Sequence, residues 1–182
     1  MATTDTISTL TPDSAYSEGG VGGPTGGPFG LIDVYNAKGI GFNKSTSAGA
    51  VWVRRLPAAA SLGTGATLVL LVADDPNNPD PGKVAVFGIN IAVLGSASLY
   101  TASLATNTAL GTEHTATVTI PADTARPTTG KTAEFSNAIT VANMGGAAAG
   151  SWVMIRVRRL GANASDTHRG RVVLLGGDLR DT

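Results

Sequence analysis

The chain has 182 residues, enough to bury the core of one domain; 42% of them are hydrophobic and only 14% are charged. Thirteen basic and thirteen acidic residues cancel, so no overall field steers the protein to nucleic acid or to an anionic membrane. Cysteine is absent, which excludes disulfide-stapled secreted domains and thiolate chemistry. The low charge suits a surface that neighbouring subunits cover.

The first 30 residues differ in composition from the rest of the chain. Residues 1–17 are rich in Thr, Ser and Asp, and Glu18–Gly30 (EGGVGGPTGGPFG) is a run of glycine and proline. Because glycine adds backbone entropy to the unfolded chain and proline donates no ladder hydrogen bond, we expect neither helix nor strand there. Two interpretations stay open: a disordered tail, or an extended arm that lies on a neighbouring subunit, with Val21 or Phe29 as its anchor.

From Leu31 onward, short apolar segments alternate with turn signals, which predicts strands. In His114–Ile120, apolar residues share one face and threonines the other, the pattern of a sheet with one buried face. About eight strands in residues 31–182 predict an all-β domain, a jelly roll or a β-sandwich, preceded by the extended arm of residues 1–30. The expected strands are Leu31–Asn36, Ala50–Leu56, Thr67–Ala73, Lys83–Leu94, Ser98–Leu104, Glu113–Ile120, Glu134–Ala142, Ser151–Leu160 and Arg171–Arg180.

Two of these segments are similar to each other. Ala50–Leu56 (AVWVRRL) and Ser151–Leu160 (SWVMIRVRRL) each contain Trp-Val and end in paired arginines followed by leucine. They are either equivalent strands in two halves of a sandwich or a coincidence in a biased composition.

No segment carries a convincing catalytic, cofactor or metal motif. Ala125–Thr132 (ARPTTGKT) fits a relaxed phosphate-binding loop, but it contains proline, leads into a strand-like segment and lacks a parallel α/β framework. The acidic loop Asp74–Asp80 lacks the spacing of a calcium loop and is interrupted by prolines, so we expect a plain surface turn. His114 and His168 are far apart and follow no zinc-binding pattern. We therefore expect no enzyme, no cofactor and no metal; His114 is expected to face solvent.

Paired arginines make two strand regions locally basic. The residues are Arg54, Arg55, Arg156, Arg158 and Arg159. They either balance scattered aspartates within the subunit or pair with carboxylates of a partner, for which arginine is the preferred residue. Nucleic-acid binding is not expected, because no basic cluster is accompanied by stacking aromatic residues.

The most specific segment is Ser151–Arg180 (SWVMIRVRRLGANASDTHRGRVVLLGGDLR). A strand ending in arginine leads through a Gly-Ala-Asn-Ala-x-Asp-Thr loop to a Gly-x-x-x-Leu-Leu-Gly-x-x-Leu-Arg strand. This segment resembles the closing hairpin of structural proteins of tailed bacteriophages, most of all capsid decoration (cement) proteins. In the hairpin, Asn163 and Asp166 can close Asx turns, and Gly161 and Gly170 permit positive φ. The core contacts are expected from Leu174, Leu175 and Leu179.

The resemblance implies jelly-roll subunits that assemble as trimers on the phage head and have no catalytic residues. The expected partners are the major capsid protein and other copies of the chain, with no nucleic acid, membrane or small-molecule ligand. The polar N-terminus lacks the apolar stretch of a signal peptide, so we expect synthesis in the host cytoplasm and a final location on the capsid surface. The alternative is a tail, baseplate or fibre component that binds another virion protein or a host glycan.

Overall fold

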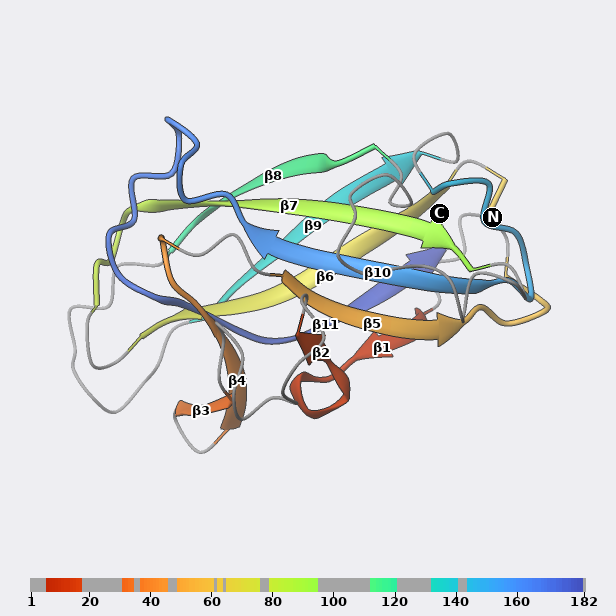
Figure 1. Cartoon of the computed structure of the whole chain (residues 1–182), viewed down its shortest axis with the longest axis horizontal. Helices are drawn as coiled ribbons and strands as arrows, with labels where there is room; N and C mark the ends of the chain where they lie inside the picture. Colours follow the sequence, from red (N-terminus) through yellow and green to blue (C-terminus); the bar gives the residue numbers. More distant parts are fainter. Residues whose placement is uncertain are drawn as a thin grey trace.

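The chain folds as a β-sandwich, as the strand pattern predicts (Figure 1). The computed structural model describes residues 6–17, 31–34, 37–45, 49–60, 62–63, 65–75, 79–94, 112–120, 132–140 and 144–181. Within these ranges, two antiparallel sheets pack face to face over one hydrophobic core. No helix in the same ranges has the length and apolarity that crossing a membrane requires.

One sheet has the order β3-β4-β11-β6-β9, and β1 also pairs with β11, beside β4. The other sheet has the order β2-β5-β10-β7-β8. The strands are β1 (Thr6–Leu10), β2 (Tyr16–Ser17), β3 (Leu31–Val34), β4 (Ala37–Phe42), β5 (Gly49–Arg55), β6 (Gly65–Asp74), β7 (Val84–Val93), β8 (His114–Thr119), β9 (Thr132–Thr140), β10 (Trp152–Arg159) and β11 (Val172–Asp181).

Eight of the expected strands are present as β3 and β5 to β11, and the expected strand at Ser98–Leu104 lies outside the described residues. The strand β4 was missed, because its glycines weaken a strand signal. Gly39 is needed there: a Cβ at this position would lie 2.3 Å from a methyl carbon of Val173 on β11. Because glycine has no side chain, β4 can pair with β11 without a clash between residue 39 and the Val173 side chain.

The expectation of no regular structure in the first 30 residues is wrong for residues 6–17. The strand β1 pairs with β11, a 3-10 turn follows at Pro12–Ser14, and β2 pairs with β5. Ile7 and Leu10 enter the core, which provides the apolar burial that a polar-looking segment needs to become ordered. The Gly/Pro run Glu18–Gly30, with Val21 and Phe29, lies outside the described residues.

The two similar Trp-Val segments are neighbours in one sheet, which corrects the hypothesis of equivalent strands in two halves. They form β5 and β10, which pair antiparallel with Trp152 opposite Arg55. Their tryptophans also differ in environment: Trp52 is fully buried, whereas Trp152 is 46% exposed. The sequence similarity of β5 and β10 therefore does not reflect similar environments for the two tryptophans.

The core places its largest side chains between the two sheets. Phe42 of β4 and Phe87 of β7 meet edge to face, with their ring centroids 5.9 Å apart. Trp52 of β5 is fully buried, and its indole Nε1 donates a hydrogen bond of 2.9 Å to the carbonyl oxygen of Thr11. This bond joins the N-terminal segment to the second sheet.

Replacing Trp52 with phenylalanine is expected to lower the free energy of unfolding by about 1–2 kcal/mol. The phenyl ring keeps most of the apolar contacts, but it removes the donor for the Thr11 carbonyl oxygen and leaves a small void. Urea unfolding followed by circular dichroism measures the change. The matched control is Trp152→Phe, an exposed position where we expect a change below about 0.5 kcal/mol; equal losses in the two variants would contradict the role of Trp52.

Candidate functional site

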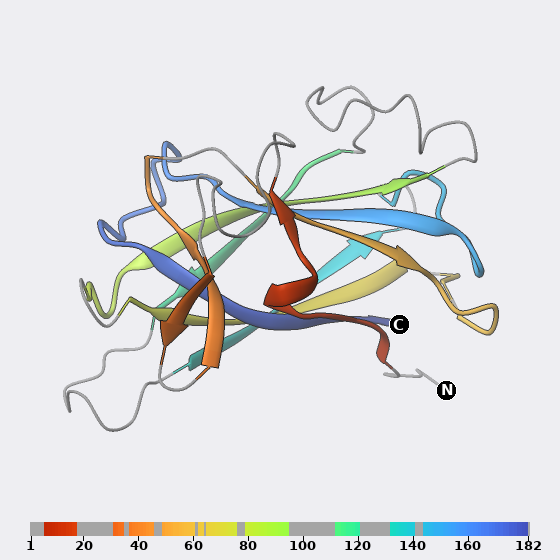
Figure 2. The ribbon, with the colours of Figure 1, turned by 60° about the horizontal axis from the view of Figure 1, so that its bottom comes forward.

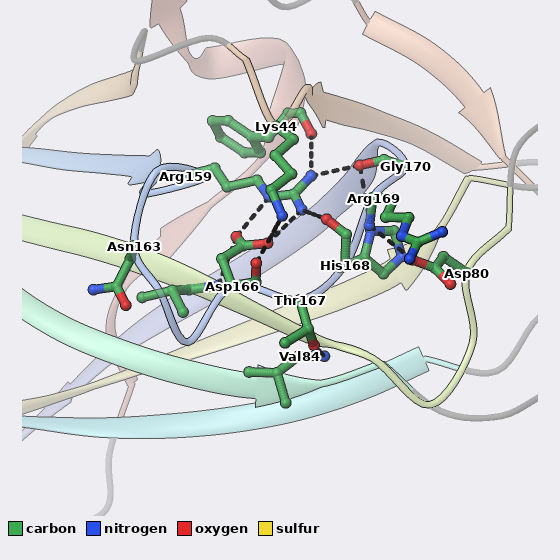
Figure 3. A network of polar contacts seen from close by, with 12 residues as sticks. Lys44, Asp80, Val84, Arg159, Asn163, Asp166, Thr167, His168, Arg169 and Gly170 are labelled. Atoms are coloured by element: carbon green, nitrogen blue, oxygen red, sulfur yellow. Dashed lines mark hydrogen bonds and ion pairs between the residues drawn. The ribbon is translucent and has the colours of Figure 1, made fainter.

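The closing loop, which joins β10 of the second sheet to β11 of the first, belongs to a buried polar cluster around Arg159, the last residue of β10 (Figure 3). The Arg159 side chain pairs with Asp166 through two hydrogen bonds, from Nε to Oδ2 at 2.9 Å and from Nη2 to Oδ1 at 2.8 Å. Its other donors go to the carbonyl oxygens of Phe42, His168 and Gly170. All five N–H donors of the guanidinium are therefore used inside the subunit.

Asp166 also accepts hydrogen bonds from groups other than Arg159. Its Oδ2 also accepts a hydrogen bond of 3.1 Å from the backbone N–H of Val86 on β7. The Nζ of Lys44, which follows β4, donates to the Asp166 carbonyl oxygen at 2.7 Å. The Asp166 side chain is inaccessible to solvent. One carboxylate thus connects the closing loop to two neighbouring strands of the second sheet, β7 and β10.

His168 extends the cluster toward the acidic loop. Its Nε2 lies 3.0 Å from Oδ1 of Asp74, and its Nδ1 lies 3.3 Å from the Gly170 carbonyl oxygen. Beside it, the backbone N–H of Arg169 donates to Oδ2 of Asp80, and the backbone N–H of Asp80 donates to Oδ2 of Asp74. The aspartates of the loop are therefore occupied by partners from the protein, and the described residues contain no group of three or more side chains suited to a metal ion.

The chemistry of this cluster is structural. Arg159, Asp166 and His168 are each at most 4% exposed, and their polar atoms are bonded to one another or to the backbone. A catalytic group must reach its substrate, and these groups lie out of reach of one. The cluster holds three connecting segments together: the closing loop between β10 and β11, the acidic loop after β6, and the turn after β4.

The expectation of a closing hairpin is wrong: β10 pairs with β5 and β7 and β11 pairs with β4, β6 and β1, so the two strands lie in different sheets. The loop that joins them keeps part of the expected motif. Asn163 does close an Asx turn, with its Oδ1 accepting from the backbone N–H of Ser165 at 2.9 Å. Asp166 instead binds Arg159. Gly161 and Gly170 do not have positive φ; Gly161 is required because a Cβ would lie 1.9 Å from the Lys44 carbonyl oxygen.

The three leucines of the motif differ in burial. Leu174 and Leu179 are fully buried in the core, as expected, whereas Leu175 is only partly buried. It lies where the register between β11 and β6 shifts, between Leu174 and Gly176.

Arg156 and Arg158 point to the outer face of the second sheet, opposite the core residues that alternate with them. Arg156 is 2% exposed and binds Oδ1 of Asn90 at 3.1 Å and 2.7 Å. Arg158 forms a two-bond pair with Glu113, at 2.6 Å and 3.0 Å. Glu113 lies flat over Gly88 of β7, where a Cβ would come within 2.5 Å of its carboxylate oxygen.

We expect Gly88→Ala to lower the free energy of unfolding by about 1–2 kcal/mol, because the new methyl group displaces Glu113 from Arg158. In a Glu113→Ala background the same substitution should cost little, since no carboxylate remains to be displaced. Chemical denaturation of the four variants in this cycle measures the coupling. Gly63→Ala, at a position with no atom within 4 Å of the new Cβ, is the control; additive losses at Gly88 and Glu113 would refute the mechanism.

The five arginines predicted to contact a partner do not form one surface. Arg156 and Arg159 are 2% and 1% exposed in the subunit, and Arg158 pairs with Glu113. Arg54 is partly buried and holds the N-terminal segment, through the carbonyl oxygen of Thr9 and the hydroxyl of Ser14. Arg55 is exposed; its Nε donates to the Gly150 carbonyl oxygen at 3.4 Å.

The exposed feature nearest to Arg55 is Trp152, which sequence reasoning noted only as part of a repeat. Trp152 is the sole large hydrophobic residue with an exposed side chain among those the structure describes. It lies directly opposite Arg55 on the outer face, and its carbonyl oxygen accepts from the N–H of Leu94. Leu94 packs against a small apolar cluster on this face, formed by Val51, Ala92 and Met154. The alternation along β10, which places Val153 in the core, was the signal that Trp152 points outward.

His114 lies on the core-facing side of β8 rather than in solvent. It is half-buried, on the same face as Ala116 and Val118. The expectation that it faces solvent is corrected by this register.

The sequence matches no protein-family model, and no curated protein matches it significantly. Among solved structures, the CBM22-1 xylan-binding domain of Xyn10C from Paenibacillus barcinonensis matches with a TM-score of 0.46 and 9% sequence identity. The match covers 100% of this chain and 97% of that domain. At this identity, the ligand of that domain does not transfer to this chain.

Proposed function

We propose that the protein is a non-catalytic structural component of a phage virion, a decoration protein that binds the head and bridges major capsid subunits. The observation that carries the proposal is the buried cluster formed by the closing loop between β10 and β11. The segment that resembles decoration proteins contributes to a buried cluster, in which Arg159 and Asp166 bond to each other and to backbone groups of the subunit. The charged side chains of this cluster thus stabilise the subunit itself. Contacts with a partner would be made by other residues, on the exposed surface.

The contact surface that fits this role is the outer face around Trp152. An exposed tryptophan beside an exposed arginine has the composition of the residues that dominate protein–protein binding energy. The apolar cluster of Val51, Ala92 and Met154 lies in the same face and gives it a rigid base. We name this surface, Trp152 with Arg55 and Leu94, the Trp152 patch.

Bridging works by addition. Each subunit contributes a modest contact, and a shell that carries many copies releases them slowly, because several contacts must break together. A rigid sandwich suits this task, since little conformational entropy is lost when it binds. The function needs no cofactor and no substrate pocket.

The second candidate is a tail, baseplate or fibre component. The Trp152 patch is the observation that keeps it open, because an indole ring beside an arginine also suits a sugar ring carrying a carboxylate.

Location separates the two candidates. Antibodies against the protein, labelled with gold, are applied to particles of the phage that encodes it and viewed by negative-stain electron microscopy. Gold over the head surface is the expected result. Gold confined to the tail overturns the decoration function in favour of the second candidate, and particles without gold overturn both.

A further inference from the structure

An open cavity of about 470 Å³ lies among the three connecting segments that the Arg159 cluster holds together. Figure 2 shows the turn after β4, the acidic loop and the closing loop gathered at the end of the sandwich where β11 begins. Trp152 and Arg159 are the first and last residues of β10, so this cavity is separate from the Trp152 patch. The residues that line it are Asn43, Lys44, Ser45, Asp75 and residues 169–171.

Positive and negative side chains lie at different depths around this cavity. The carboxylates lie inside, because Asp75 and Asp166 are 3% and 4% exposed and each is paired with an arginine. The cations lie nearer to solvent: the side chains of Lys44 and Arg171 are 35% and 32% exposed, and Arg169 is exposed. Although the whole chain has no net charge, the wall of the cavity therefore presents positive charge to solvent.

Arg169 is the cation of this wall that has no partner. Its backbone N–H donates to Oδ2 of Asp80, but its guanidinium forms no hydrogen bond or ion pair with any residue that the structure describes. Arg171, in contrast, uses its Nε and Nη2 on Oδ2 of Asp75, at 2.8 Å and 2.7 Å. Lys44 donates one N–H of its ammonium group to the Asp166 carbonyl oxygen, and two further N–H donors remain. The cavity thus offers unused donors from a guanidinium and from an ammonium group.

The backbone that carries these cations is held in place on both sides of the cavity. On one side, the Gly170 carbonyl oxygen accepts from Arg159, and the Arg171 carbonyl oxygen accepts from the backbone N–H of Asp75. On the other side, Gly161 packs against Lys44, where a Cβ would lie 1.9 Å from the carbonyl oxygen. Because the backbone is already ordered, an anion that binds here loses little affinity to ordering of the protein.

From these observations we propose that the cavity binds acidic side chains of a partner protein, and that Arg169 and Lys44 receive their carboxylates. A guanidinium carries paired donors that match the two oxygens of a carboxylate. A cavity of about 470 Å³ has the size of sites that hold a molecule of many atoms rather than a single ion. None of the described residues that line it is aromatic, so the bases of a nucleic acid have no ring to stack on. The inference does not rest on the proposed function.

Titration of the natural chain with a synthetic peptide of six glutamates tests the site, with backbone amide signals followed by nuclear magnetic resonance at low salt. Saturable shifts are expected at residues 169–171, and added salt should weaken binding because exposed charges are screened. Arg169→Ala should weaken binding about fivefold, the most that one exposed ion pair supplies. Since the Arg169 side chain has no partner in the subunit, this variant should fold as the natural chain does.

Arg55→Ala is the matched control, because Arg55 is also an exposed arginine but lies opposite Trp152, at the other end of β10. It should bind the peptide with the affinity of the natural chain. The proposal is overturned if residues 169–171 show no shifts, or if Arg169→Ala binds as tightly as the natural chain. Two further ligands are compared at equal ionic strength, a single-stranded oligonucleotide of six thymidines and inorganic phosphate. Either of them binding at these residues as tightly as the peptide also overturns an acidic protein segment as the occupant.

Discussion

Asp166→Ala is expected to lower the free energy of unfolding by about 3–5 kcal/mol, the typical cost of removing one partner from a buried ion pair. The loss is large because the Arg159 guanidinium stays behind, 1% exposed and without its two charge-assisted hydrogen bonds. The backbone N–H of Val86 also loses its acceptor. Urea unfolding, followed by the fluorescence of the two tryptophans, measures the change.

Two further variants separate charge from packing. Arg159→Met/Asp166→Leu removes both charges, so its loss should be smaller than that of Asp166→Ala, although three carbonyl oxygens lose their donor. Lys44→Ala removes a partly exposed cation, and we expect a loss of at most about 1 kcal/mol. A loss below about 1 kcal/mol for Asp166→Ala would contradict the role of the cluster in holding the closing loop between β10 and β11.

Under the proposed decoration function, Trp152→Ala should weaken binding to phage heads by about 30-fold, equivalent to about 2 kcal/mol. The indole is the large exposed apolar group of the Trp152 patch. Its removal therefore deletes the main apolar contact that a partner makes with this patch. The free energy of unfolding of the isolated subunit should fall less than it would for truncation of the fully buried Trp52, because Trp152 is 46% exposed. Co-sedimentation with heads prepared without the protein, over a range of concentrations, measures the affinity.

The matched control for this surface is Thr117→Ala, an exposed residue on β8 that lies outside the Trp152 patch. It should bind heads as the natural chain does. Arg55→Ala should weaken binding less than Trp152→Ala, and more at low salt than at high salt, because an exposed charge is screened. Binding of Trp152→Ala with unchanged affinity would show that heads are contacted through another face.

The strands could be predicted where alternation was strong, and the exceptions have physical reasons. The alternation in His114–Ile120 correctly predicted β8 and its buried face. The strand β4 was missed because Gly39 and Gly41 supply no side-chain pattern, although close packing against β11 is what requires a glycine at position 39. The strand β1 was missed because its order depends on tertiary burial of Ile7 and Leu10, which five residues of sequence do not reveal.

The candidate site was only partly predictable. Sequence reasoning identified the arginines but not their partners, because pairing of Arg158 with Glu113 joins residues 45 positions apart. Arg159 and Asp166 are only 7 residues apart, yet their pairing depends on how the closing loop folds back. The motif in residues 151–180 shows which residues are present, but it reveals neither that β10 and β11 lie in different sheets nor that Arg159 is buried and Trp152 exposed.

The stability of the phage head tests the central claim most directly. Heads prepared without the protein are melted in a scanning calorimeter, alone and after saturation with the purified natural chain, with Trp152→Ala at the same concentration as the matched control. A decoration function predicts that the natural chain binds and raises the melting temperature of the heads, and that the variant gives a smaller rise. Heads that bind none of the protein and melt at an unchanged temperature would contradict it.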